Sequence, residues 1–201
     1  TDTPPLPGKI AALLRESKWF ALIALAAYLL LILLTFDKAD PGWFHSTAAG
    51  AVKNAGGRAG AWLSELLLYL FGLSAYWLAA LLIYIVAAGY RRLDGSSLLD
   101  KRPLVIALAG FAILIAASCG LEALRVYSLK AALPPLAPPG GILGDVVRSL
   151  VHGTFGFTGA TLILLTLISI GASLFTGISW LTVIEITGAA LEAMYSFAQQ
   201  S

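Results

Sequence analysis

Long apolar segments alternate with shorter polar ones along this chain. A helix of about 20 apolar residues spans the hydrocarbon layer of a bilayer, so the pattern predicts four transmembrane helices and an all-α integral membrane fold. Polar residues gather between the crossings, in segments 37–65 and 122–155, which we expect to be outer loops that carry short helices. The four apolar segments contain no charged residue: 19–36, 66–90, 103–121 and 156–174.

The two halves of the chain follow one plan at a constant offset of 84 residues. The pattern Gly-Gly-x-x-Gly, followed by Phe-Gly, occurs in residues 56–72 and again in residues 140–156. An even number of crossings separates the copies, so both halves have the same orientation and form two parallel-repeat hairpins. We expect the first glycine of each copy to adopt positive φ in a turn and the last to allow close packing.

Composition and charge support a membrane protein. The chain is 59% hydrophobic and 12% charged, whereas a soluble domain is about half apolar and a quarter charged. A net charge of +2 without a basic patch gives no reason to expect nucleic-acid binding by this segment. Lys and Arg are densest in residues 1–18, a basic tail, and in the link at 91–102. The positive-inside rule then predicts that both termini are cytoplasmic.

Motifs for catalysis and cofactor binding are missing from the sequence. It contains no phosphate-binding loop, His-Glu-x-x-His, Cys-x-x-Cys or Gly-x-Ser-x-Gly. His45 and His152 both fall in outer loops at spacings that do not suit a metal site. Cys119 lies in an apolar helix, where packing is the simpler interpretation. We therefore expect no catalytic residue, no cofactor and no metal.

Glu65 is surrounded by apolar neighbours, and a charge within a membrane is by default a functional candidate. We favour the simpler alternative that residues 60–71 form a tilted or re-entrant helix with Glu65 at the outer interface. Gly72 would end this helix, and residues 73–90 would complete the second crossing. Helix is favoured from residue 47 onward in the first loop and at residues 143–152 in the second.

Two further features are the glycines at the start of the fourth crossing and the segment that follows this crossing. Gly153, Gly156 and Gly159 lead into the fourth crossing and would permit close helix approach. After the membrane domain, residues 19–178, the segment 179–201 reads as an amphipathic helix that begins a cytoplasmic linker or contacts a partner.

Several stretches together resemble the N-terminal membrane domain of FtsK/SpoIIIE-type DNA translocases. They are Phe36-Asp-Lys-Ala-Asp-Pro-Gly-Trp43, Asn54-x-Gly-Gly-x-x-Gly-Ala61, Leu66-Leu-Leu-Tyr-Leu-Phe-Gly-Leu-Ser-Ala-Tyr76, Gly140-Gly-x-Leu-Gly144 and Thr176-Gly-Ile-Ser-Trp-Leu181. The resemblance implies a bacterial inner-membrane anchor at the division septum, followed in the family by a linker and a hexameric ATPase motor. It also implies contacts with other division proteins and a homo-oligomer, with no motor activity in this segment.

Two functions remain open at this point. The first is a membrane anchor and divisome-interaction domain whose outer loops are the working surface. The alternative is a small membrane transporter or channel subunit, which would need a wet cavity lined by Ser64, Ser74, Ser118 or Glu65. For the first function, the candidate partner-binding residues are Trp43, Phe44, Gly56, Gly57, Gly60, Glu65, Gly140, Gly141, Gly144 and Asp145.

Overall fold

The computed structural model describes residues 8–43, 52–92, 102–129 and 139–179, with isolated helical positions at 182, 184–185, 187–189 and 192. All regular structure in these parts is helical. The predicted all-α fold is confirmed. The amphipathic helix expected at 179–201 lies for the most part outside the described residues, as do Phe44 and residues 47–51 of the first loop.

In the described parts of the chain, four long helical units are apolar enough to cross a membrane. Their mean hydropathy lies between 1.9 and 2.5, which agrees with four crossings. The helices are α1 (Gly8–Leu34), α2 (Gly57–Phe71), α3 (Tyr76–Arg92), α4 (Arg102–Leu129) and α5 (Gly141–Thr176), with a 3₁₀ turn, η1 (Gly72–Ala75), between α2 and α3.

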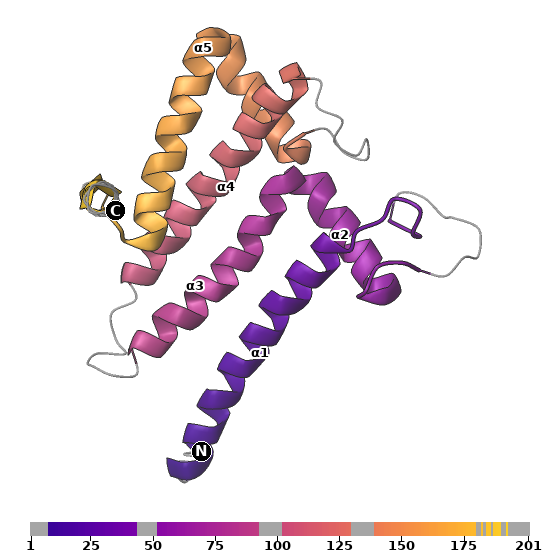
Figure 1. Ribbon diagram of the computed structural model, residues 1–201, viewed down its shortest axis with the longest axis vertical. Helices are drawn as coiled ribbons and strands as arrows, with labels where there is room; N and C mark the ends of the chain where they lie inside the picture. The colour runs from indigo at the N-terminus through magenta and orange to yellow at the C-terminus, as the bar shows by residue number, and fades with distance from the viewer. Residues whose placement is uncertain are drawn as a thin grey trace, which may run out of the picture.

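Each half of the molecule contains one long helix and one bent unit (Figure 1). In the first half, α2 stops at Gly72, whose φ of 59° is left-handed, and the chain turns through η1 into α3. In the second half, α5 bends at Gly156, which has a φ of 65°, so that residues 141–155 correspond to α2. The bend recurs at the 84-residue offset because glycine adopts this conformation without a steric penalty.

The glycine predictions are correct in outline and wrong in one detail. In the second copy the first glycine, Gly140, has a φ of 76°. In the first copy, however, positive φ falls on Gly57, whereas Gly56 has a φ of −83°. The last glycines pack as expected: a Cβ on Gly60 would lie 2.5 Å from Asn54 Oδ1, and one on Gly144 would lie 3.0 Å from the carbonyl carbon of Cys119.

The two helices expected in the loops differ from the structure in their described parts. Residues 47–51 of the first lie outside the described residues, and residues 52–56 are not helical, because residues 54–56 form a turn closed by a hydrogen bond from Gly57 N to Asn54 O; α2 begins at residue 57. The helix expected at 143–152 begins instead at residue 141 and continues into the fourth crossing with a bend.

Beyond the bend in α5, close approach between α4 and α5 comes from glycines other than Gly153 and Gly156. Around Gly153 and Gly156, no described atom lies within 4 Å of an added Cβ. The close contacts occur at Gly110, where a Cβ would lie 2.6 Å from Phe175 N, and at Gly171, where it would lie 2.7 Å from Leu114 N. Glycine thus allows the two helices to pack backbone against backbone, as in other membrane bundles.

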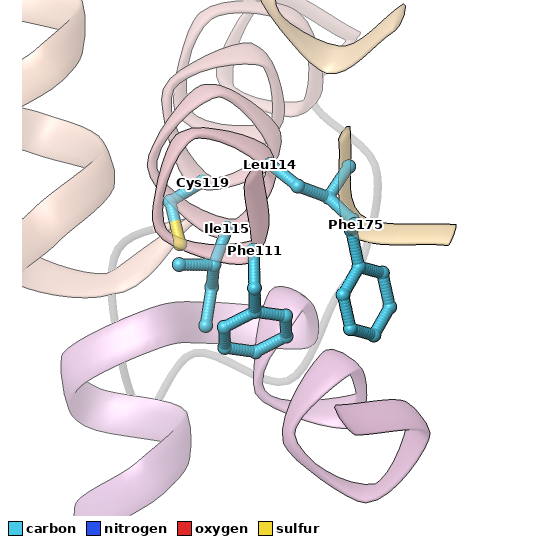
Figure 2. Close-up of a cluster of buried hydrophobic side chains, with 5 residues drawn as sticks. All are labelled: Phe111, Leu114, Ile115, Cys119 and Phe175. Carbon is cyan, nitrogen blue, oxygen red and sulfur yellow. The ribbon is translucent and has the colours of Figure 1, made fainter. Parts of the chain in front are cut away.

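The second half has the larger buried cluster. Phe111, Leu114, Ile115 and Cys119 on α4 pack with Phe175 on α5. Figure 2 shows Phe111 and Ile115 pointing from α4 toward the ribbon of the first half. Side chains of α2 and α3 pack against this cluster, which therefore joins the two halves.

Candidate functional site

One surface of the first half, formed by α2 and the loop after α1, is organised around Glu65. Its side chain is only 3% exposed, and it accepts a hydrogen bond from the backbone N–H of Trp43. A buried carboxylate is costly unless it is hydrogen-bonded. Glu65 on α2 therefore holds the loop that follows α1, and the structure gives it a positioning role. Direct contact of Glu65 with a partner stays a prediction.

Two further polar side chains fasten the same loop. Asp40 accepts hydrogen bonds from the backbone N–H groups of Lys53 and Asn54, both at 2.7 Å. The Asn54 amide donates to the carbonyl of Ile32 at 2.9 Å, and its oxygen accepts from Gly56 N at 2.9 Å. Asp40 and Asn54 are both buried. Together with Glu65 they form what we call the loop clamp, which joins the end of α1, the loop and α2.

An ion pair extends the clamp at the surface. Lys53 Nζ lies 2.8 Å from Asp37 Oδ2. This hydrogen bond, together with one from Ala39 N, lowers the pKa of Asp37, and the same carboxylate raises the pKa of Lys53. Lys53 is exposed and Asp37 is partly exposed, so the pair contributes little free energy by itself.

The clamp leaves an aromatic pair on the outside. Trp43 is 62% exposed, and its ring meets that of Trp62 on α2 edge to face, with centroids 5.7 Å apart. Amphipathic rings of this kind occur at membrane interfaces and at protein contacts. The predicted contact residue Trp43 is thus accessible, whereas the need for Trp62 beside it was missed, because only the fold brings the two rings together.

The corresponding surface of the second half is simpler. Asp145 is exposed and forms an ion pair with Arg148 one turn later, at 2.8 Å. Gly140, Gly141 and Gly144 are buried against the first half or against α4 and are not accessible to a partner in this chain. Phe44 lies outside the described residues, and the structure separates the other nine predicted residues into accessible ones and ones that shape the fold.

A polar groove lies where the halves meet, beside the start of α3 and the C-terminal part of α4. The Glu122 carboxylate accepts hydrogen bonds from the backbone N–H groups of Leu73 and Ser74, at 3.0 and 3.1 Å, and so caps the start of the second crossing. The Ser74 and Ser118 hydroxyls lie 2.9 Å apart. These side chains, with Trp77, line a cavity of about 390 Å³. Ser64 and Glu65 do not line it: Ser64 accepts a hydrogen bond from the Asn54 amide of the loop clamp, and Glu65 is itself part of the clamp.

The described residues contain no group of three or more His, Cys, Asp or Glu side chains placed to hold a metal ion. Cys119 is buried, and its Sγ lies 3.3 Å from the carbonyl oxygen of Phe71. It packs at the interface between the halves.

These features define a multi-pass α-helical membrane domain with a structured surface at one end. The sequence profile described as the 4TM region of DNA translocase FtsK/SpoIIIE matches residues 11–188. The chain belongs to this family, and is accordingly a multi-pass inner-membrane domain of a DNA translocase.

Curated relatives agree with this assignment. The chain is 43% identical over 200 residues to DNA translocase FtsK 2 of Ralstonia nicotianae, covering 97% of this chain and 25% of that protein. It is 39% identical over 163 residues to DNA translocase FtsK of Vibrio vulnificus, covering 81% of this chain and 16% of that protein. The chain thus spans about a quarter or less of the length of these relatives. No solved structure matches it.

Proposed function

We propose that this domain anchors a DNA translocase in the inner membrane and carries its own surface for binding other division proteins, without motor activity. The observation that carries the proposal is the loop clamp. Anchoring requires only apolar helices, yet this chain buries Asp40, Asn54 and Glu65 to fix the shape of one outer loop. Buried polar groups of this kind specify one conformation when all are hydrogen-bonded. A loop with a fixed shape and an exposed Trp pair is suited to recognition.

Orientation follows from the ends of the helices. Figure 1 shows that the start of α1, the end of α3 and the start of α4 lie toward one end of the molecule, and α2 toward the other. The basic residues Lys18, Arg91, Arg92 and Arg102 belong to the first end. The positive-inside rule supports placing that end in the cytoplasm, with both termini, and the loop clamp on the periplasmic side at the septum.

The test is the cellular position of this chain fused to a fluorescent protein, in dividing bacteria depleted of the full-length translocase. We expect accumulation at mid-cell. The double variant Trp43→Ala, Trp62→Ala should be inserted normally but spread over the membrane. Phe20→Ala is the matched control, because Phe20 is an exposed aromatic residue on α1, remote from the clamp. A uniform signal from the unaltered chain, or mid-cell accumulation of the double variant, would reject the proposal.

The transporter alternative has one observation in its favour, the cavity lined by Ser74, Ser118 and Glu122. However, both carboxylate oxygens of Glu122 already accept hydrogen bonds from the first half of the chain, so its polar groups serve packing. A transporter would be stabilised against heat by its substrate, and Glu122→Gln would remove that effect.

A further inference from the structure

The two halves of this chain meet head to tail at their outer helices. The last turn of α2 abuts the first turn of α5: a Cβ on Gly141 would lie 2.6 Å from Phe71 N, and one on Gly72 would lie 2.6 Å from Gly140 Cα. Phe71 packs against the apolar cluster of each half. Figure 1 shows α2 and the first part of α5 in this succession. The first half therefore contributes the end of α2, which we call the tail, and the second half contributes the start of α5, which we call the head.

Each half also has the other kind of surface: the start of α2 is a second head, and the bend of α5 is a second tail. Described residues do not cover either of them. The residue equivalent to Gly141 is Gly57, and the residue equivalent to Gly72 is Gly156; no described atom lies within 4 Å of an added Cβ at either. Phe155, the equivalent of Phe71, is 56% exposed. The surfaces that meet inside the chain thus recur, uncovered, at its two sides.

The membrane-spanning helices show the same correspondence: residues that pack inside the chain have equivalents that are exposed at its sides. Leu78 and Leu81 of α3 pack against the α4 cluster, whereas their equivalents on α5, Leu162 and Leu165, are 62% and 46% exposed. On the opposite side, Ile115 of α4 is 7% exposed, and its equivalent on α1, Leu31, is 44% exposed. Exposed apolar residues in a bilayer need no partner by themselves, because lipid covers them. However, the equivalent residues in the other half do pack against protein, and this correspondence indicates that the exposed residues have a protein partner as well.

We infer that copies of this chain associate head to tail, with Phe155, Leu162 and Leu165 of one copy against α1 and Gly57 of the next. The contact is a repetition of the one that joins the two halves. All copies share one orientation in the membrane, so the operation is a rotation about the membrane normal, which gives a ring where it closes. The inference adds a specific contact to the homo-oligomer that the family resemblance implies, and it rests on the proposed membrane topology.

One difference between the halves affects how tightly two copies would bind each other. Inside the chain Glu122 caps the helix that starts at Gly72. The position equivalent to Glu122 in the first half is Lys38, whose ammonium cannot accept a hydrogen bond. The start of the crossing at Gly156 therefore receives no equivalent cap from the next copy. We expect the contact between copies to be weaker than the internal one.

The test joins two positions that flank the inferred contact. Arg58→Cys is placed on one tagged copy and Thr154→Cys on a second copy with a different tag, and both are co-expressed in membranes. A short bis-maleimide is then added. Arg58 and Thr154 are exposed, whereas the native Cys119 is buried. Ser149→Cys replaces Thr154→Cys in the control, because Ser149 is exposed on the same helix but on another face.

We expect a several-fold excess of the Arg58–Thr154 heterodimer over the Arg58–Ser149 control, and a ladder of larger species when one copy carries both Arg58→Cys and Thr154→Cys. A second pair within the membrane, Leu31→Cys with Leu165→Cys, should behave in the same way. Heterodimer yields equal to the control for both pairs would overturn the inference. Mid-cell localisation in the same cells would then show that anchoring and partner binding persist without this contact.

Discussion

Replacing Gly141 with alanine tests how the two halves are held together. Gly141 has a φ of 63°, and a Cβ there would lie 2.6 Å from the backbone N of Phe71. Gly57 is the matched control, with a φ of 65° and no described atom within 4 Å. Both variants have the left-handed cost of about 1–2 kcal/mol. Only Gly141→Ala must also displace packed backbone, which costs typically about 1–3 kcal/mol more.

Cys119 provides the assay, because it is buried where Phe71 of the first half meets α4. The rate of maleimide labelling of its thiol measures opening of this interface in a detergent that keeps the chain monomeric. Since 1.4 kcal/mol is a factor of about ten, Gly141→Ala should be labelled roughly five- to hundredfold faster than Gly57→Ala. Circular dichroism checks that both variants stay helical. Equal labelling rates would refute the view that glycine contacts join the halves.

Three further changes test the loop clamp and the cap. Asn54→Ala leaves the Ile32 carbonyl without its buried partner, should cost about 1–3 kcal/mol, and should speed trypsin cleavage after Lys53 relative to the unaltered chain. The Asp37–Lys53 pair lowers the pKa of Asp37 below 3.8, so its stabilisation is complete above that value and lost as the pH falls through the lowered pKa. The unfolding difference from Asp37→Asn should accordingly vanish in acid, and a difference that persists there would contradict the assignment. Glu122→Ala removes the acceptor for two backbone N–H groups and should lower thermal stability by about 1–2 kcal/mol, whereas Glu122→Gln should cost less.

The crossings and the repeat could be predicted because they depend on local rules. Uncharged apolar segments have few stable alternatives to membrane-spanning helix, and the glycine pattern marks turns that other residues adopt only with strain. The 84-residue offset reappears in the structure as two bends, at Gly72 and Gly156. The suggestion that a separate helix precedes Gly72 also agrees with α2 and η1.

The loop clamp could not be predicted, because it depends on residues far apart in the sequence. Glu65 looked unfavourable beside its apolar neighbours, and only the path of the loop brings the Trp43 N–H to it. The contacts that Gly110 and Gly171 make between α4 and α5 were missed for the same reason. Gly110 and Gly171 have no special local pattern, but they lie where two backbones cross, whereas Gly153 and Gly156 fall at the bend.

The difference between the two loops, 37–65 and 122–155, bears on where partner recognition is located. Both halves have a positive-φ glycine at the start of the helix that precedes the bend and another at the bend itself, and these glycines shape the membrane domain. The first half adds three buried polar side chains to fix its loop, while the described part of the second shows an exposed Asp145–Arg148 pair on a single helix. Buried polar groups are costly unless every hydrogen bond is made, so they persist where a fixed conformation matters. We therefore expect substitutions at the Trp43–Trp62 pair to impair recruitment more than substitutions at Asp145. The opposite order would place recognition in the second half.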